Sequence, residues 1–313
     1  MTKLYIVIPC FNESEVLSET SKRLKEKFSV LIDKKIITAD SKVIFVDDGS
    51  SDDTWNIVKS LNKQDDMFLG CKLSRNRGHQ NALLAGLECA KGNCDAVISM
   101  DSDLQDDIDA IDRFVEEYEK GYEVVYGVRN KRKKDSAFKR ITAEGFYKFM
   151  KFMGAEVVFN HADYRLLGKN ALEKLFEFEE VNLFLRGLVP LIGYKSTKVY
   201  YERSERYAGK SKYPFKKMLS FAFDGISSLS IKPIKMIINL GLIFLVISLF
   251  ILIYSLISYF SGNAVSGWTS IILSIWAIAG LNLIAIGIIG EYVGKVLLET
   301  KHRPRYIIEE KLK

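Results

Sequence analysis

The chain has 313 residues, of which 48% are hydrophobic and 27% charged, enough for one large domain or two smaller ones. Its formal net charge of +6 is modest and unevenly distributed. The four cysteines lack the paired C-x-x-C spacing of zinc sites, so we expect small core residues in a reducing compartment. The first residues lead straight into a short apolar run without a basic region, which predicts no secretory signal.

Short apolar runs alternate with helical patterns over the first 130 residues. Strands are expected at 4–8, 43–46, 68–73, 95–100 and 123–126, and helices at 16–28, 55–61 and 81–90. Alternation of this kind predicts βαβ units and a mostly parallel, doubly wound α/β sheet.

Polar motifs follow the first four predicted strands. They are Pro9-Cys10-Phe11-Asn12-Glu13, Asp47-Asp48-Gly49-Ser50, Arg75-Asn76-Arg77-Gly78 and Asp101-Ser102-Asp103-Leu104-Gln105. In an open α/β sheet, ligands bind just outside the carboxyl ends of the strands, so the four motifs are expected to form one rim. Two carboxylates there, Asp101 and Asp103, can hold a divalent cation against a phosphate, because hard cations prefer oxygen ligands. Gln105 adds a neutral oxygen ligand.

A second Asp-x-Asp pair follows closely, formed by Asp107 and Asp109. It falls in a helical pattern with Ile108, Ile111 and Val115 at helix spacing. We therefore interpret this pair as part of a solvated helix face rather than as a metal site.

Each rim motif also has an ordinary structural explanation. Residues 47–50 alone are typical of a turn that caps a helix. Arg75 and Arg77 alone would be solvated charges, and His79 alone a polar residue at a helix N-terminus. Neither G-x-G-x-x-G nor G-x4-G-K-[ST] occurs, which argues against dinucleotide redox and P-loop chemistry.

In order and spacing, the four motifs together resemble the family 2 glycosyltransferases with the GT-A fold. The closest branch is that of polyprenyl-phosphate glycosyltransferases, such as dolichyl-phosphate mannose synthase and the bactoprenol glucosyltransferases, and the resemblance covers nearly the whole chain. The resemblance assigns Pro9, Phe11 and Glu13 to the nucleotide pocket, Asp47 and Asp48 to base or ribose, Arg75 and Gly78 to the base side, and Asp101, Asp103 and Gln105 to Mg²⁺ or Mn²⁺ on the diphosphate.

A cluster of cations begins at Arg129 and continues through Arg140. The segment 138–153 that follows is rich in Phe and Met with interspersed lysines, which favours a basic amphipathic helix on a membrane surface. Nucleic acid is a weaker candidate partner, and an ordinary packed helix with a basic loop is the structural alternative. By the resemblance, Arg129 and Arg140 would face the lipid phosphate and the donor diphosphate.

Asp163 matches a family position close to the acceptor, where a general base is one role. A phosphate monoester has a second pKa of about 6 and is already ionised at neutral pH, so it needs no base. Asp163 would then hold a sugar hydroxyl or orient a basic residue, and capping a following helix is the structural alternative. Further on, Arg206, Ser211 and Lys212 resemble the family's Arg-x-x-Gly-x-Ser-Lys loop, which would close over the diphosphate or the lipid phosphate; a basic hairpin is the alternative.

Two uncharged stretches, about 236–260 and 268–293, are each long enough to cross a bilayer and predict a two-helix transmembrane hairpin. Lysines and arginines flank the outer ends of the hairpin but not its turn, so both chain termini are expected in the cytoplasm of a cell-membrane protein. We predict a GT-A domain at 1–213, an interfacial amphipathic segment at 214–235, the hairpin at 236–298 and a cytoplasmic tail at 299–313.

The predicted activity is inverting transfer of a sugar from a nucleotide diphosphate sugar to undecaprenyl or another polyprenyl phosphate. UDP-glucose is the first choice of donor, ahead of UDP-N-acetylglucosamine and GDP-mannose. A processive polysaccharide synthase is less favoured because the chain lacks the Gln-x-x-Arg-Trp motif. A non-catalytic sugar-nucleotide-binding membrane module is the alternative outside enzymes. Homo-oligomerisation is left open.

Overall fold

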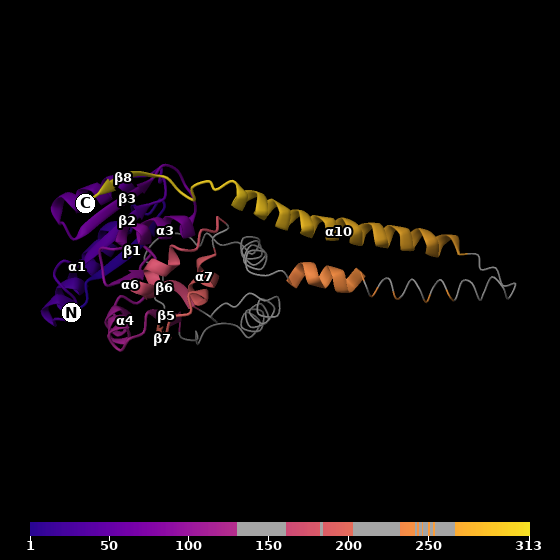
Figure 1. The fold of residues 1–313 in the computed structure, drawn as a ribbon. Coiled ribbons are helices and arrows are strands. Elements are labelled where there is room, and N and C mark those ends of the chain that lie inside the picture. Colours follow the sequence, from indigo (N-terminus) through magenta and orange to yellow (C-terminus); the bar gives the residue numbers. More distant parts are fainter. Residues whose placement is uncertain are drawn as a thin grey trace.

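A computed structural model describes residues 1–129, 161–181, 184–202, 232–241 and 267–313, together with 243, 246, 250 and 253. These residues form an α/β domain from which helices extend to one side (Figure 1).

The domain is built on an eight-stranded mixed sheet in the order β7-β5-β6-β4-β1-β2-β3-β8. The strands are β1 (Leu4–Cys10), β2 (Lys42–Asp47), β3 (Phe68–Leu73), β4 (Ala96–Ser99), β5 (Val124–Arg129), β6 (His161–Gly168), β7 (Ser196–Tyr201) and β8 (Ile308–Leu312). The four central neighbours β4, β1, β2 and β3 are parallel, as predicted. β6 runs antiparallel to both β4 and β5, and β8 runs antiparallel to β3.

Helices cover both faces of the sheet, because successive strand side chains point to opposite sides. Ile6 and Ile8 of β1 face a core shared with α1 (Leu17–Asp33), α2 (Thr54–Gln64) and α4 (Ala110–Glu119). Tyr5 and Val7 face a second core shared with α3 (His79–Ala90), α6 (Lys169–Leu175) and α7 (Leu185–Leu191). The doubly wound α/β class predicted from the sequence is confirmed.

Three strands of the sheet were not predicted, namely β6, β7 and β8, and the first two lie between residues 161 and 201. Asp163 lies inside β6, so its interpretation as the cap of a following helix is wrong. The sequence of β6 does not look like a buried strand because it places a carboxylate and a guanidinium, Asp163 and Arg165, two residues apart. β7 alternates between exposed and buried residues and is the edge strand beside β5.

The segment 299–313, predicted as a tail, contains β8, which pairs with the edge of β3 (Figure 1). Trp55 Nε1 of α2 donates a hydrogen bond to Glu310 Oε2 at 3.0 Å, and Lys72 Nζ of β3 lies 2.9 Å from Glu309 Oε2. The C-terminal end of the chain is thus part of the sheet.

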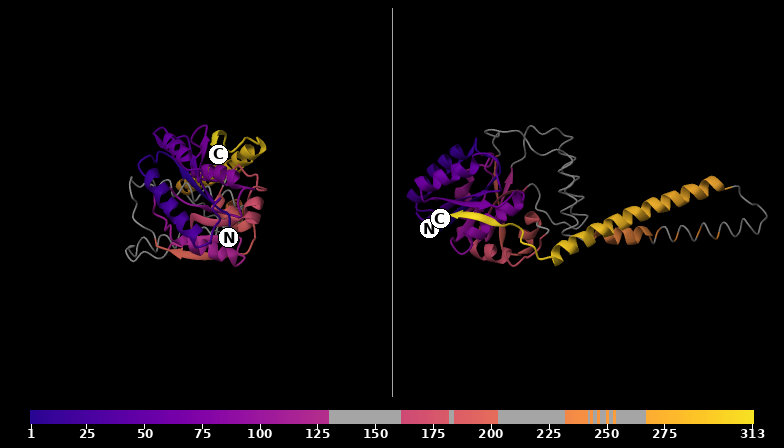
Figure 2. Two further views of the ribbon diagram at one scale, coloured as in Figure 1. Left: turned by 90° about the vertical axis from the view of Figure 1, so that its left-hand side faces the viewer. Right: turned by 90° about the horizontal axis from the view of Figure 1, so that it is seen from above.

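A single long helix, α10 (Trp268–Thr300), leads away from the domain (Figure 2). Its 33 residues span about 50 Å, more than the roughly 30 Å of a bilayer's hydrocarbon core. Within the part of the chain that the structure describes, one helix is long and apolar enough to cross a membrane, and it is this one. Residues 232–241 are helical, while most of the predicted first span and the segment 214–231 lie outside the described residues.

Gly86 sets the distance between α3 and the sheet. A Cβ at this position would lie 2.3 Å from Val7 Cγ1 and 2.6 Å from Val46 Cγ2. Gly86→Ala is therefore expected to destabilise the domain by roughly 1–3 kcal/mol through overpacking, although alanine normally stabilises a helix relative to glycine.

Thermal unfolding of the detergent-solubilised chain measures this effect. Lys22→Ala, on the exposed face of α1, is the control and should change stability by no more than about 0.5 kcal/mol. A Gly86→Ala variant as stable as the wild type would show that α3 can move away from β1 and β2 without loss.

Candidate active site

The loops after β1 and β2 are joined by side-chain hydrogen bonds. The backbone N–H of Asn12, a residue with a φ of 54°, donates to Ser50 Oγ at 3.0 Å, and Asn12 Oδ1 accepts from the N–H of Ser51 at 2.9 Å. Pro9 is buried in β1, while Phe11 next to this junction keeps 38% of its surface exposed. Glu13 is half-buried and its N–H donates to Thr54 Oγ1. The predicted nucleotide-pocket residues thus lie at the carboxyl end of β1.

Asp48 organises the loop after β3. Its two carboxylate oxygens accept from the backbone N–H groups of Arg77 at 2.7 Å and Gly78 at 2.9 Å. Burial raises the pKa of Asp48, and these two hydrogen bonds act in the opposite direction. Gly49, at a φ of +67°, allows the close approach, because a Cβ would lie 2.6 Å from the backbone nitrogen of Asn76. Asp48 therefore fixes the backbone of the loop 75–78, in which Arg75 is exposed.

Asp47 differs from its neighbour in having an uncommitted oxygen. Asp47 Oδ1 accepts from the N–H of Ser50 at 3.1 Å. Within the described part of the chain, Asp47 Oδ2 is buried without a hydrogen-bond partner. Burial raises the pKa of this carboxyl, as expected for an acid without a strong counter-charge. Of the two acids, Asp47 is therefore the one with an unsatisfied acceptor, on a side chain that is fully buried.

The acidic loop after β4 has an unusual backbone. Leu104, between Asp103 and Gln105, has a φ of +56°, a conformation that side chains other than glycine rarely adopt. Asp103 Oδ1 accepts from the N–H of Gln105 at 3.2 Å, and Thr20 Oγ1 of α1 donates to the carbonyl of Ser102 at 3.0 Å. Strained residues of this kind cluster at functional sites.

Asp101 and Asp103 suit a cation that substrate phosphates complete. Desolvation raises the pKa of Asp101, and the nearby carboxylates of Asp163 and Asp103 raise it further, so a divalent cation would relieve this repulsion. In the described ranges, no group of three or more His, Cys, Asp or Glu side chains could enclose a metal ion by itself. Mg²⁺ is usually held by one or two carboxylates together with phosphates rather than by a complete protein cage, so the residues fit that kind of site.

Arg129, at the end of β5, joins the acidic loop through Asp106 and Tyr201. Arg129 Nε donates to Tyr201 Oη at 3.2 Å, and that hydroxyl donates to Asp106 Oδ1 at 2.6 Å. Burial raises the pKa of Asp106 to about 6. The predicted Arg129 therefore does lie beside the acidic loop, on the face turned to β7.

Asp163 is the centre of a buried ion cluster. Because β6 is antiparallel to β4, its first residues reach the same rim where β4 ends. Arg165 Nη2 lies 2.6 Å from Asp163 Oδ1, and Arg186 of α7 donates Nε to Oδ1 at 3.1 Å and Nη2 to Oδ2 at 3.0 Å. Burial alone would raise the pKa of Asp163, but Arg186, His79 and Arg165 outweigh it and hold the pKa well below its usual range. A carboxylate so acidic is a poor general base.

His79 connects the acidic loop with this cluster. Its Nε2, at the start of α3, lies 3.7 Å from Asp101 Oδ1 and 3.6 Å from Asp163 Oδ2. Sequence reasoning treated His79 as an ordinary helix N-terminal residue and did not select Arg165, Arg186 or Asp106. The one sequence signal for Arg186 was a lone cation in the otherwise uncharged run of α7.

Comparison with known proteins identifies the family. The sequence profile described as glycosyl transferase family 2 matches residues 5–176, more than half of the chain. The chain belongs to this family. The resemblance seen in the motifs is thereby confirmed, and the rim described above is the candidate active site of a glycosyltransferase.

Relatives match over nearly the full length. The uncharacterized glycosyltransferase YkoT of Bacillus subtilis (strain 168) is 52% identical over 306 residues, covering 98% of this chain and 91% of the relative. A bactoprenol glucosyl transferase of Shigella phage SfV is 36% identical over 309 residues, covering 98% of each. A crystal structure of Mycobacterium tuberculosis glucosyl-3-phosphoglycerate synthase with Mn²⁺, UDP and glucosyl-3-phosphoglycerate has 16% identity and a TM-score of 0.45 over 73% of this chain and 78% of that one.

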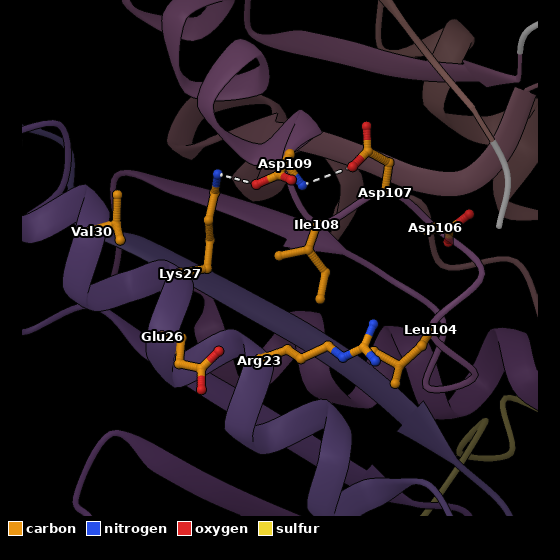
Figure 3. Close-up of a pocket in the computed structure, with 9 residues that line it drawn as sticks. All are labelled: Arg23, Glu26, Lys27, Val30, Leu104, Asp106, Asp107, Ile108 and Asp109. Carbon is orange, nitrogen blue, oxygen red and sulfur yellow. Dashed lines mark hydrogen bonds and ion pairs between the residues drawn. The ribbon is translucent and has the colours of Figure 1, made fainter. Parts of the chain in front are cut away.

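The sequence interpretation placed the second Asp-x-Asp pair on a helix face, and this is wrong, because the pair precedes the helix. Asp107 and Asp109 precede α4, and they pair with Arg113 at 3.3 Å and with Lys27 at 2.8 Å. They border a cavity of about 410 Å³ between α1 and the loop that precedes α4, shown in Figure 3. The predicted site residues do not line this cavity. The other predicted site residues, Arg140, Arg206, Ser211 and Lys212, lie outside the described residues, as does the segment 138–153.

Asp48→Asn should loosen the loop that Asp48 holds. The asparagine side chain has only one acceptor oxygen, so its NH₂ group would face one of the two backbone N–H groups that Asp48 now binds. One hydrogen bond to a charged group, worth about 1.5–3 kcal/mol, is therefore lost. We expect a lower melting temperature and weaker binding of UDP by calorimetry. Asp53→Asn, in the exposed turn before α2, is the matched control, and equal behaviour of the two variants would refute an organising role for Asp48.

Asp163→Asn should leave Arg165 buried without a counter-charge, at a loss of roughly 3–5 kcal/mol. Because the pKa of Asp163 is lowered in the folded state, its stabilising contribution is present above the ordinary pKa of aspartate and is lost as the pH falls through the lowered value. Denaturant unfolding at neutral pH would measure the loss. The control is Asp107→Asn, whose partner Arg113 is 47% exposed, with an expected effect of at most about 1 kcal/mol.

Proposed function

We propose that this glycosyltransferase transfers a sugar, with UDP-glucose as the first choice of donor, to a polyprenyl phosphate at the membrane surface. The observation that carries the proposal is the meeting of two unlike clusters at one rim: the acids Asp101 and Asp103, and the arginine-rich cluster around Asp163. The first suits a cation on a diphosphate, and the second suits an anionic acceptor. The bactoprenol glucosyl transferases among the full-length relatives support the lipid acceptor.

Asp101, Asp103 and Gln105 would hold Mg²⁺ or Mn²⁺. When bound, such an ion neutralises negative charge on the departing nucleoside diphosphate. Asp47 and Phe11 would contact the nucleotide, while Asp48 fixes the loop that carries Arg75 and Gly78.

Deprotonation of the acceptor needs no residue of the chain. A phosphate monoester is doubly ionised above a second pKa of about 6 and can attack the anomeric carbon directly. The task of the protein is then to bring two anions together, which positive groups at fixed positions accomplish. Arg129, Arg186 and Arg165 all lie at or just behind the rim. Asp163 acts by holding two of them rather than by accepting a proton.

The base of α10 adjoins the same side of the domain. The N–H of Val181, just before α7, donates to Glu299 Oε2 at 2.8 Å, and the Arg305 guanidinium donates to the carbonyl of Phe178. If α10 crosses the membrane, this contact holds the α7 side of the rim at headgroup depth. We propose a two-span membrane protein with both termini and the rim in the cytoplasm.

Transfer of labelled sugar to undecaprenyl phosphate in detergent tests the proposal. UDP-glucose, UDP-N-acetylglucosamine and GDP-mannose are compared, each with Mg²⁺, with Mn²⁺ and with chelator. We expect lipid-linked product from one donor, reduced at least about 100-fold by chelator and by Asp103→Ala, because both remove charge stabilisation of the leaving group.

The matched control is Asp109→Ala, which alters the second Asp-x-Asp pair and should retain wild-type activity. Binding of UDP without product from any donor would count against the proposal and favour a non-catalytic module. Product in the presence of chelator would argue against the cation.

A further inference from the structure

We propose that Arg186 is a phosphate-binding residue of this site, held in its binding orientation by Asp163. The inference rests on the proposed function and assigns to one arginine, outside the recognised motifs, the contact with a phosphate oxyanion of the substrates.

The first argument is orientation. Nε and Nη2 of Arg186 donate to the two oxygens of Asp163, a two-point contact that fixes the plane of the guanidinium. Asp163 is itself fixed, because Arg165 Nη2 lies 2.6 Å from it and the Ser99 hydroxyl donates to its backbone carbonyl. The Arg186 side chain nevertheless keeps 31% of its surface exposed. It is a cation whose orientation is fixed and whose side chain is partly exposed at the rim.

The second argument is charge. Asp163 carries one negative charge and contacts two arginines, which leaves one positive charge in excess. Asp101 and Asp103 carry two negative charges, which a divalent cation on them would match. With that cation in place, these five side chains and the cation have a net charge of +1, the sign that attracts a phosphate anion.

The third argument is the placement of α7. The N–H of Leu185 donates to Gln80 Oε1 of α3 at 2.8 Å, and the carbonyl of Leu185 accepts from Arg165 Nη1 at 3.4 Å. Arg186 follows directly, so its backbone is anchored to the same two elements that carry His79 and Asp163. The segment before α7 is tied to α10 through Glu299. The helix that carries Arg186 is thus connected both to the cluster beside the acidic loop and, through the segment before it, to the base of the helix that can cross the membrane.

Two phosphates present the same chemistry at this position: the monoester of the lipid acceptor and the diphosphate of the donor. Calorimetry on the full chain in detergent separates them, with farnesyl phosphate as one ligand and UDP with Mn²⁺ as the other. Arg186→Gln is expected to weaken one of these affinities by about 10-fold or more, the loss typical of a hydrogen bond to a charged group. Arg186→Lys, which keeps the charge without the planar fork, should weaken it less.

Arg23→Gln is the matched control, since Arg23 is also a partly exposed arginine in an ion pair, with Glu19 of α1. If Arg186→Gln weakens the affinity for farnesyl phosphate only, Arg186 binds the acceptor phosphate. If it weakens the affinity for UDP with Mn²⁺ only, Arg186 binds the donor diphosphate. Asp163→Asn should weaken the same affinity, and adding it to Arg186→Gln should have little further effect if the two act as a unit.

Unchanged affinities for both ligands in the glutamine and lysine variants would overturn the proposal. Should Arg186→Gln fail to fold, the lysine variant alone decides by the same criterion. The binding measurements do not depend on turnover, so a wild-type chain that transfers no sugar to undecaprenyl phosphate would refute the proposed function while these affinities still judge Arg186.

Discussion

The architecture of the site depends on the ion pairs that the Asp163 carboxylate forms with Arg165 and Arg186. Arg165 is buried inside the sheet, and a guanidinium there is tolerated only with a counter-charge in contact. Asp163 supplies that charge and at the same time orients Arg186 and approaches His79. One acid thus links β6 and α7 with α3, which lies far from both in the sequence. The low pKa that results keeps it ionised throughout the physiological range.

On the other side of the rim, rigidity comes from the backbone rather than from ion pairs. Asp48 receives two N–H groups from the loop after β3, and Gly49 permits the approach that this requires. Between the first two loops, Ser50 Oγ accepts from the backbone N–H of Asn12, and Asn12 Oδ1 accepts from that of Ser51. The half of the rim assigned to the nucleotide is therefore organised by hydrogen bonds, whereas the half nearest α10 is organised by charge.

Local patterns in the sequence predicted the first half of the fold well. β1 to β4 are short apolar runs ending in turn residues, and β3 was predicted at its observed bounds. β6 was not predicted because its two charged residues neutralise each other only after folding, which no local pattern reveals. For the same reason the motifs predicted Asp101 and Asp103, and the family resemblance predicted Asp163, but neither pointed to Arg186 or His79, whose contacts are with partners more than twenty residues away. Family resemblance supplied Arg129, and the structure supplied the Tyr201 and Asp106 that hold it.

The return of β8 to the sheet bears on how the protein is made. A chain grows from its N-terminus, so β3 is synthesised long before the strand that covers its edge. Until then β3 is an open edge, of the kind that pairs with other chains and aggregates. Its natural partner arrives only after α10 has left the ribosome. Completion of the catalytic sheet is thus coupled to synthesis of the apolar helix, and a nascent chain that stalls before α10 carries an unprotected strand.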